Sequence, residues 1–141
     1  MIFYLDTSLI IAALTPEART GHIQDWLVAQ DAGTLAVSGW VVTEVSSALS
    51  IKIRTGALSL DDRAAALAAW HRLLDDSLEM ETIQAKQYAM AASYTDRHEL
   101  GLRAGDALHL AVAFDQGMTL ATLDKTLAEA GQQVGAMTSL L

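Results

Sequence analysis

Residues 1–14, MIFYLDTSLIIAAL, place one carboxylate between two apolar runs. The first run, residues 2–5, predicts a strand of a parallel sheet that is covered on both faces. The second run, residues 7–14, predicts a short helix that ends before Pro16. Asp6 therefore stands where a buried strand ends and a helix begins. This position suits two roles, a helix N-cap or a ligand at the edge of the sheet.

The rest of the chain alternates between strand and helix patterns. Strands are expected at residues 34–38 and 118–122, with brief strands at 77–82 and 132–137. Helices are expected at residues 20–30, 40–54, 104–116 and 124–130, and two more begin near Ser59 and Ala85. This alternation predicts an α/β fold in which helices flank a mainly parallel central sheet of four to five strands.

Two of the expected helices carry stripes of residues at helical spacing. A capping-box-like Ser59-x-x-Asp62 begins the first of them. The core stripe expected there is Leu60, Ala64, Leu67, His71 and Leu74. The stripe expected in the second helix is Ala85, Tyr88, Ala89 and Ala92.

The composition predicts a single globular domain over residues 1–141. Hydrophobic residues make up 52% of the chain and charged residues 18%, which allows a substantial core and excludes a disordered chain. The absence of cysteine excludes disulfide bonds, Cys-ligated zinc and thiol catalysis. No apolar run is long enough to span a membrane, and the N-terminus lacks the basic region of a signal peptide. A cytoplasmic location is expected.

The charge balance limits how the protein can meet a nucleic acid. Nine basic and seventeen acidic residues give a net charge of −8. This argues against sequence-independent binding of nucleic acid through a broad basic surface. It does not argue against an enzyme that meets phosphates through metal ions, because bound cations reverse the sign of the local field.

Four acids stand out because their neighbours are apolar: Asp6, Glu44, Asp106 and Asp124. Asp6 and Asp124 follow predicted strands, while Glu44 and Asp106 lie near the starts of predicted helices. Ligand sites of α/β sheets gather at the carboxyl ends of the strands, so we expect the four side chains to meet there. Converging carboxylates repel one another and raise each other's pKa, which a divalent cation relieves. Because Mg²⁺ prefers carboxylate oxygens, the sequence predicts an acidic metal site.

Each acid also has an ordinary structural interpretation. Asp6 and Asp124 suit helix N-caps, and Asp106 would favour the dipole of the helix that it begins. The basic residues available to pair with Glu44 are Lys52, Arg54 and Arg103. Taken singly, these interpretations are at least as good as the metal site; the set of four favours the site.

Several neighbouring residues are weaker candidates. Thr122 and Ser8 are placed to hold a water or a ligand carboxylate around the metal. His109 lies one helical turn after an acid and either orients it or is a satisfied core histidine. Arg103 and Lys125 each stand beside an acid, where they would contact substrate phosphates or neutralise the site.

Four segments together resemble the signature segments of the PIN-domain ribonucleases, most closely the VapC-type toxins of bacterial toxin–antitoxin pairs. In chain order they read IFYLDTSLIIA, TEVSSAL, GDALHLAVA and TLATLDKTLAEAG. The ordered set spans nearly the whole chain, and GDALHLA and LATLDKTLA are its most specific parts. The resemblance implies a PIN-like α/β/α sandwich.

The resemblance also implies a function and its residues. The acids of the family fall on Asp6, Glu44, Asp106 and Asp124, and its hydroxyl residue falls on Thr122. The implied activity is Mg²⁺- or Mn²⁺-dependent endoribonuclease cleavage of single-stranded or looped RNA. The implied partners are a second copy of the chain and a small cognate antitoxin, which inserts a basic or bulky side chain into the pocket.

Two other functions stay open. Haloacid-dehalogenase-like phosphatases also begin with a strand-terminal aspartate, but they carry Asp-x-Asp, and here the second position is Ser8. The other possibility is a non-catalytic module whose acids form a cation-dependent partner site. Such a module would bind metal and would cleave no RNA.

Overall fold

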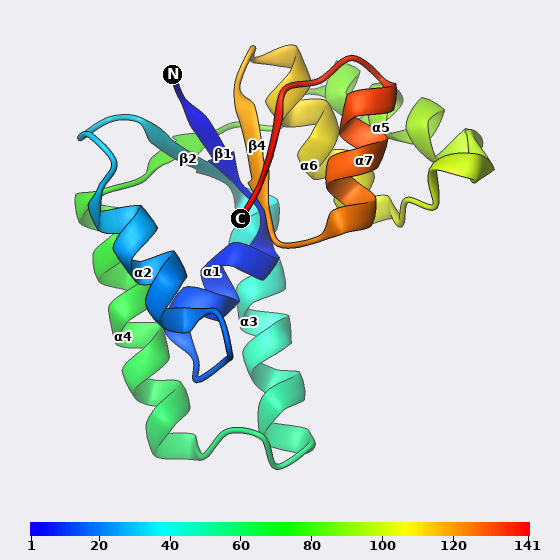
Figure 1. The fold of residues 1–141 in the computed structure, drawn as a ribbon. Helices are drawn as coiled ribbons and strands as arrows, with labels where there is room; N and C mark the ends of the chain where they lie inside the picture. Colours follow the sequence, from blue (N-terminus) through cyan, green and yellow to red (C-terminus); the bar gives the residue numbers. More distant parts are fainter.

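The computed structural model describes residues 1–141 and has a five-stranded sheet with helices on both sides (Figure 1). In chain order the strands are β1 (Phe3–Leu5), β2 (Leu35–Ser38), β3 (Glu79–Glu81), β4 (Thr119–Thr122) and β5 (Thr138–Leu140). Their order across the sheet is β3-β2-β1-β4-β5, and every neighbouring pair is parallel. The predicted α/β fold with a mainly parallel sheet is confirmed.

β1 is the central strand, since β2 and β4 pair with its two edges. Tyr4 lies opposite Ala36 of β2 and Leu120 of β4, and it is fully buried. Burial on both faces is the reason for the uninterrupted apolar run. Directly after β1, the Asp6 amide donates to the Ala121 carbonyl of β4 (3.2 Å). The hydrogen-bonded ladder therefore extends to the residue at which the acids begin.

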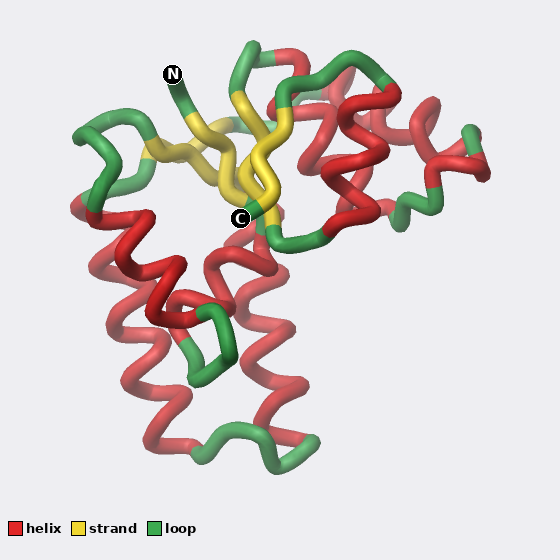
Figure 2. Tube along the Cα trace, viewed as in Figure 1, coloured by secondary structure: helices red, strands yellow, loops and turns green.

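Seven α-helices flank the sheet. They are α1 (Thr7–Leu14), α2 (Thr20–Val28), α3 (Gly39–Arg54), α4 (Leu60–Asp76), α5 (Ala85–Asp96), α6 (Ala104–Asp115) and α7 (Lys125–Gln133). Helices α1 to α4 gather on one side of the sheet and α5 to α7 on the other, with the strands between them (Figures 1 and 2). A short 3₁₀ turn, His98–Leu100, precedes α6. None of the helices has the length and apolar character needed to cross a bilayer.

The last strand lies later in the chain than predicted. Residues 132–137 form no strand, because α7 extends into this stretch and the chain then turns at Gly135, whose φ is +87°. The amides of Gly135 and Ala136 donate to the carbonyls of Gln132 and Gly131, the two bonds of a Schellman motif. The apolar residues of the stretch therefore end a helix, and β5 follows them.

The buried stripe of α4 differs from the predicted one. Leu60 is 63% exposed and Ala64 and His71 are exposed, whereas Ala66 and Trp70 are buried. The predicted residues that do pack against the core are Leu67 and Leu74. The indole of Trp70 sets the orientation of the helix, because it has the largest apolar area to remove from water.

The predicted stripe of α5 faces outward. Tyr88 is 56% exposed and the three alanines of the stripe are exposed, while Gln87 and Ala91 are buried. Gln87 tolerates burial because its amide group is paired. Its oxygen accepts from the Gln84 amide and its nitrogen donates to the Asp115 carboxylate, both at 2.9 Å. The buried face of α5 therefore includes a paired polar residue, whereas the apolar pattern predicted a stripe made mainly of alanines.

Candidate active site

The four acids lie around the carboxyl ends of the central strands. Asp6 directly follows β1, and Asp124 is the residue before α7 in the loop after β4. Asp106 is in the first turn of α6, and Glu44 is in the second turn of α3, which follows β2 without a loop. Because β2, β1 and β4 are adjacent and parallel, these positions share one edge of the sheet.

Asp6 is buried, and its two carboxylate oxygens have different partners. Oδ1 accepts from the Ser8 hydroxyl (2.7 Å) and from the Leu9 amide (3.2 Å), which makes Asp6 the N-cap of α1. Oδ2 accepts from the Thr122 hydroxyl of β4 at 2.5 Å. Burial raises the pKa of Asp6, and the hydrogen bonds from Thr122 and Ser8 oppose that rise. Asp6 is therefore a helix cap whose second oxygen faces the neighbouring strand.

Thr122 connects Asp6 with Asp124. Its hydroxyl donates to Asp6 and accepts from the Asp124 amide (2.9 Å). The Asp124 carboxylate accepts from an amide in the first turn of α7 (3.2 Å), so this acid is also an N-cap. The Ser8 hydroxyl accepts from the Leu123 amide (3.3 Å). Two hydroxyl groups therefore tie the start of α1 to the loop after β4.

Glu44 is paired with a histidine, and with none of the lysine and arginine residues considered for it. Its Oε1 accepts from His109 Nε2 at 2.5 Å and from the Thr7 hydroxyl at 2.8 Å. Lys52 pairs instead with Glu17 (3.1 Å), and Glu44 has no other ion pair. Partial burial opposes ionisation of Glu44, but the bonds from His109 and Thr7 hold its pKa below the ordinary value.

His109 does not orient Asp106, contrary to one of the two expectations for it. The imidazole is buried and turns toward α3 and β1, where its two nitrogens find separate partners. Nε2 bonds Glu44, and Nδ1 lies 2.9 Å from the hydroxyl of Tyr4. One helical turn on α6 therefore separates two residues that act on different sides of the site.

Asp106 carries the clearest electrostatic sign that the acids gather. Its carboxylate accepts no hydrogen bond from the protein. Its pKa is raised first by burial and then by the negative charge of Asp124, with smaller contributions from Asp6 and Glu44, while His109 acts in the opposite direction. The negative charge that acts on Asp106 therefore comes from the other three acids of the set.

Lysine and arginine side chains do not neutralise this charge. Lys125, beside Asp124, is 78% exposed and pairs with Glu129 (3.7 Å), and Arg103 forms no ion pair. No group of three or more Asp, Glu or His side chains is already arranged to hold a metal ion. The available donors are carboxylate oxygens around a centre of uncompensated negative charge, and this donor set suits Mg²⁺ or Mn²⁺.

Gly105 is a site residue that sequence reasoning missed. A Cβ atom at this position would lie 2.9 Å from Glu44 Oε2 and 3.0 Å from the indole nitrogen of Trp40. Helices α3 and α6 therefore approach closely here because position 105 has no side chain. The available signal was the glycine directly before Asp106 in GDALHL. The pairing of His109 with Tyr4 was missed as well.

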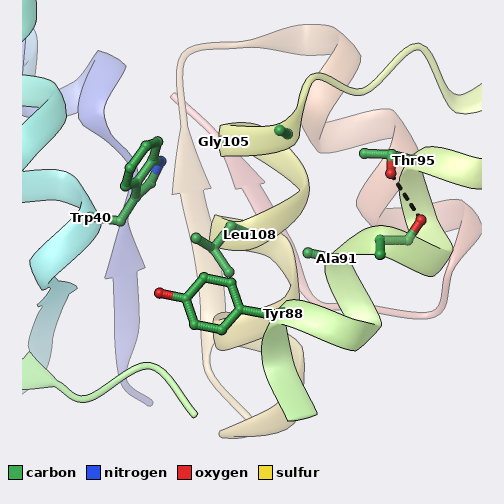
Figure 3. A pocket seen from close by; sticks show the side chains of 8 residues that line it. Trp40, Tyr88, Ala91, Thr95, Gly105 and Leu108 are labelled. Atoms are coloured by element: carbon green, nitrogen blue, oxygen red, sulfur yellow. Dashed lines mark hydrogen bonds between the residues drawn. The ribbon is translucent and has the colours of Figure 1, made fainter. Parts of the chain in front are cut away.

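A hollow of about 400 Å³ opens beside Gly105 (Figure 3). Trp40 of α3 lies on one side, and Tyr88 of α5 and Leu108 of α6 lie on the other. Most of its lining is apolar and none of it is charged. The acids therefore border an apolar surface that is open to solvent.

Comparison with known proteins identifies the family. The PIN domain family matches residues 3–132 of the chain. Similar solved structures include the Sarcin-Ricin loop cleaving toxin VapC20 of Mycobacterium tuberculosis, with 23% identity and a TM-score of 0.73 over 92% of this chain and 95% of that chain. FitAcB from Neisseria gonorrhoeae is 20% identical, with a TM-score of 0.69 over 97% of this chain and 96% of that chain.

DNA-bound VapBC from Salmonella typhimurium is 17% identical, with a TM-score of 0.70 over 99% of this chain and 97% of that chain. At these identities the solved structures show a shared fold. No curated protein sequence matches the chain. Because the family match covers most of its length, the chain belongs to the PIN domain family.

Proposed function

We propose that the protein is a Mg²⁺- or Mn²⁺-dependent endoribonuclease and the toxin of a VapBC-type toxin–antitoxin pair. The observation that carries this proposal is the convergence of four acids at one edge of the sheet, with no lysine or arginine paired to any of them. A divalent cation is the partner that such a group of acids lacks.

The four acids would have different roles in the proposed reaction. Asp6, Asp106 and Asp124 would hold the cation, with Glu44 bound directly or through water. A bound cation would supply Lewis-acid activation of a water and stabilisation of the charge that develops on the phosphate in the transition state. Glu44 or Asp124 would take the proton from the attacking water. Thr122 would keep Asp6 oriented throughout, through its 2.5 Å bond to Oδ2.

Basic residues near the acids would guide the RNA backbone. Arg103 precedes α6, and Lys125 is the first residue of α7, so both stand one to three residues from a proposed ligand. The ion pair of Lys125 with Glu129 is exposed and long, so it holds the lysine weakly. Both cations are therefore available to phosphates, even though the chain as a whole carries a charge of −8.

The proposed protein partners are a second copy of the chain and a cognate antitoxin. The similar structure from Salmonella typhimurium is a DNA-bound VapBC complex, and our chain covers nearly all of that structure's chain. Trp40, Met80 and Tyr88 are exposed and give a partner an apolar surface next to the acids. An open reading frame for a small DNA-binding protein beside the gene would supply the expected antitoxin.

The test compares RNA cleavage by the wild type and by Asp6→Asn. Asparagine caps a helix as well as aspartate does, so the variant should keep the fold while losing the charge that holds the cation. We expect the wild type with Mg²⁺ or Mn²⁺ to release new RNA ends after brief expression, and the variant to release none. A chelator should abolish cleavage by the wild type.

The matched control is Asp61→Asn, which removes an exposed carboxylate from the first turn of α4, away from the site. This control should cleave as the wild type does. Cleavage by Asp6→Asn at the wild-type rate would overturn the metal site. Metal binding by the wild type without cleavage of any RNA would favour the binding module, and a trapped phospho-aspartate would favour the phosphatase.

A further inference from the structure

A chain of buried hydrogen bonds lies behind Glu44. His109 of α6, Tyr4 of β1 and Ser38 of β2 are all at most 1% exposed. The Tyr4 hydroxyl lies 2.7 Å from the Ser38 hydroxyl and 2.9 Å from His109 Nδ1, and His109 Nε2 lies 2.5 Å from Glu44 Oε1. Three different elements thus contribute one polar group each, and the chain ends on the only member that reaches solvent.

The direction of these bonds follows from the carboxylate. An ionised carboxylate only accepts hydrogen bonds, so His109 Nε2 must carry the proton that faces Glu44. In the neutral imidazole, Nδ1 is then an acceptor, and the Tyr4 hydroxyl donates to it. With the imidazole neutral and Tyr4 donating to it, the Ser38 hydroxyl donates to Tyr4. In this protonation state every donor of the network points toward Glu44.

This hydrogen-bond network fixes one carboxylate oxygen of Glu44 and leaves the other without a hydrogen bond. Oε1 accepts from both His109 and Thr7, and Oε2 has no hydrogen bond within the protein. Oε2 lies on the side of Gly105, where the missing side chain leaves room for it. The carboxylate therefore presents a single oxygen in a defined direction.

A purely structural role explains this arrangement poorly. Apolar residues of similar volume at positions 4, 38 and 109 would pack the core without any polar group to satisfy, and such replacements are often neutral or stabilising. Buried polar networks are favourable only when each member is paired, so they are demanding to build. In this protein, the whole network ends on one half-buried acid, Glu44, and fixes its orientation.

We propose that His109 is a positioning residue for Glu44, and that Tyr4 and Ser38 hold the imidazole so that Oε2 alone faces the metal site. This inference rests on the proposed function, because it assigns Glu44 Oε2 to the cation or to its water. Positioning of this kind, from groups that bond a metal ligand but do not touch the metal, is a general feature of metal sites.

The test measures Mn²⁺ affinity by calorimetry, which needs neither RNA nor catalysis. His109→Leu keeps the bulk and removes the donor, and we expect it to weaken Mn²⁺ binding by roughly tenfold, the usual effect of losing a partner around a metal ligand. His109→Gln places an amide donor near the position of Nε2 and should restore most of the affinity. Rescue by glutamine separates positioning from packing, because glutamine fills the core less well than leucine does.

A double-mutant cycle shows whether His109 acts through Glu44. In a Glu44→Ala background, His109→Leu should leave the Mn²⁺ affinity unchanged, because the acid that it positions is absent. An equal loss of affinity in both backgrounds would overturn the inference. So would wild-type Mn²⁺ affinity in His109→Leu, even with a lower melting temperature, since histidine would then serve the core alone.

Tyr4→Phe is the second variant, and it removes a single oxygen from the core. It should weaken Mn²⁺ binding by a few-fold in the same direction, and wild-type affinity in a folded Tyr4→Phe would count against the inference. If the wild type binds Mn²⁺ with the expected cycle and cleaves no RNA, the proposed function fails and the positioning role stands. If the wild type binds no Mn²⁺, both fail.

Discussion

Two parts of the acidic site differ in how firmly the protein holds its carboxylates. Asp6 accepts hydrogen bonds on both of its carboxylate oxygens, from Ser8 and Thr122, and Glu44 accepts two bonds on Oε1, from His109 and Thr7. Asp106 accepts none. The comparison shows that the fold fixes part of the site before any ligand arrives and leaves one acid to respond to the ligand.

The difference extends to charge. Hydrogen bonds lower the pKa of Glu44, so the folded protein favours its ionised form. Burial and the neighbouring acids raise the pKa of Asp106, so the folded protein disfavours its ionised form. Preorganised ligands reduce the rearrangement needed for binding, while a carboxylate without a partner in the protein is free to bind a cation, which favours its ionised form. In the proposed metal site, the firmly held and the free carboxylates would therefore have complementary roles.

The substitution Asp106→Asn tests the difference between the free and the firmly held carboxylates most strongly. Removal of the free carboxylate should lower RNA cleavage by about 100-fold or more, a usual loss for a group that acts on transition-state charge. The same change should raise stability at neutral pH, because it removes a charge that burial and the neighbouring acids disfavour. Cleavage rates and urea unfolding of the metal-free protein measure the two effects, which have opposite signs.

The stability gain should depend on pH with a definite sign. A carboxyl whose pKa is raised above 3.8 on folding binds more protons folded than unfolded, so its contribution to stability falls as the pH rises through the raised pKa. The advantage of Asp106→Asn should therefore be absent at low pH and grow from about pH 4 upward. A variant that is less stable than the wild type at pH 7 would contradict this account.

Thr122→Val weakens the firmly held part of the site. Valine has the shape of threonine but no hydroxyl, so the buried Oδ2 of Asp6 loses its donor. An unpaired buried acceptor of this kind costs about 1–3 kcal/mol of the free energy of unfolding. Urea unfolding should show this loss, and Thr122→Ser, which keeps the hydroxyl, should recover most of it. Equal stability of the valine variant and the wild type would show that the bond adds nothing.

Gly105→Ala should have the smallest effect, because it removes no functional group and only displaces the Glu44 carboxylate. The added methyl group would meet Glu44 Oε2 and the Trp40 indole, and the side-chain ends can move aside at little cost. We expect about a tenfold loss of cleavage, as for other small displacements of a catalytic group, with under about 1 kcal/mol of change in stability.

The matched control for this variant is Gly21→Ala. A Cβ atom at Gly21 of α2 would meet no atom within 4 Å. Its stability should rise by up to about 1 kcal/mol, because alanine is the better helix former, and its cleavage rate should be that of the wild type. Equal cleavage by the two alanine variants would remove Gly105 from the site.

The sequence predicted the sheet and the placement of the acids for the same reason. Buried parallel strands are uninterrupted apolar runs, and the polar residue that follows such a run lies at the carboxyl edge of the sheet. This reasoning located β1, β2 and β4, and Asp6 and Asp124 after them. The helix stripes were harder, because α4 and α5 carry alanine on several faces. Trp70 and the paired Gln87 decide there which face is buried.

The side-chain contacts within the site could not be predicted from the sequence pattern. Tyr4 and Ser38 look like ordinary strand residues, and only the register of β1 beside β2 brings their hydroxyls to 2.7 Å. His109 has Asp106 as its near neighbour on α6, yet its partner Glu44 is 65 residues away in the chain. Spacing along one element shows which residues share a face, but partners across elements depend on how the elements pack.

The bond from Thr122 to Asp6 also bears on when the acidic site is assembled. It joins residues 116 positions apart in the chain, and β1 pairs along one whole edge with β4. Contacts at such separation form late, because a long loop must close before they stabilise anything. The first hundred residues supply β1, β2, β3 and two of the four acids, but neither β4 nor the Thr122 hydroxyl that donates to Asp6. The proposed metal site would thus be complete only in the last stage of synthesis, when β4 joins β1 in the sheet.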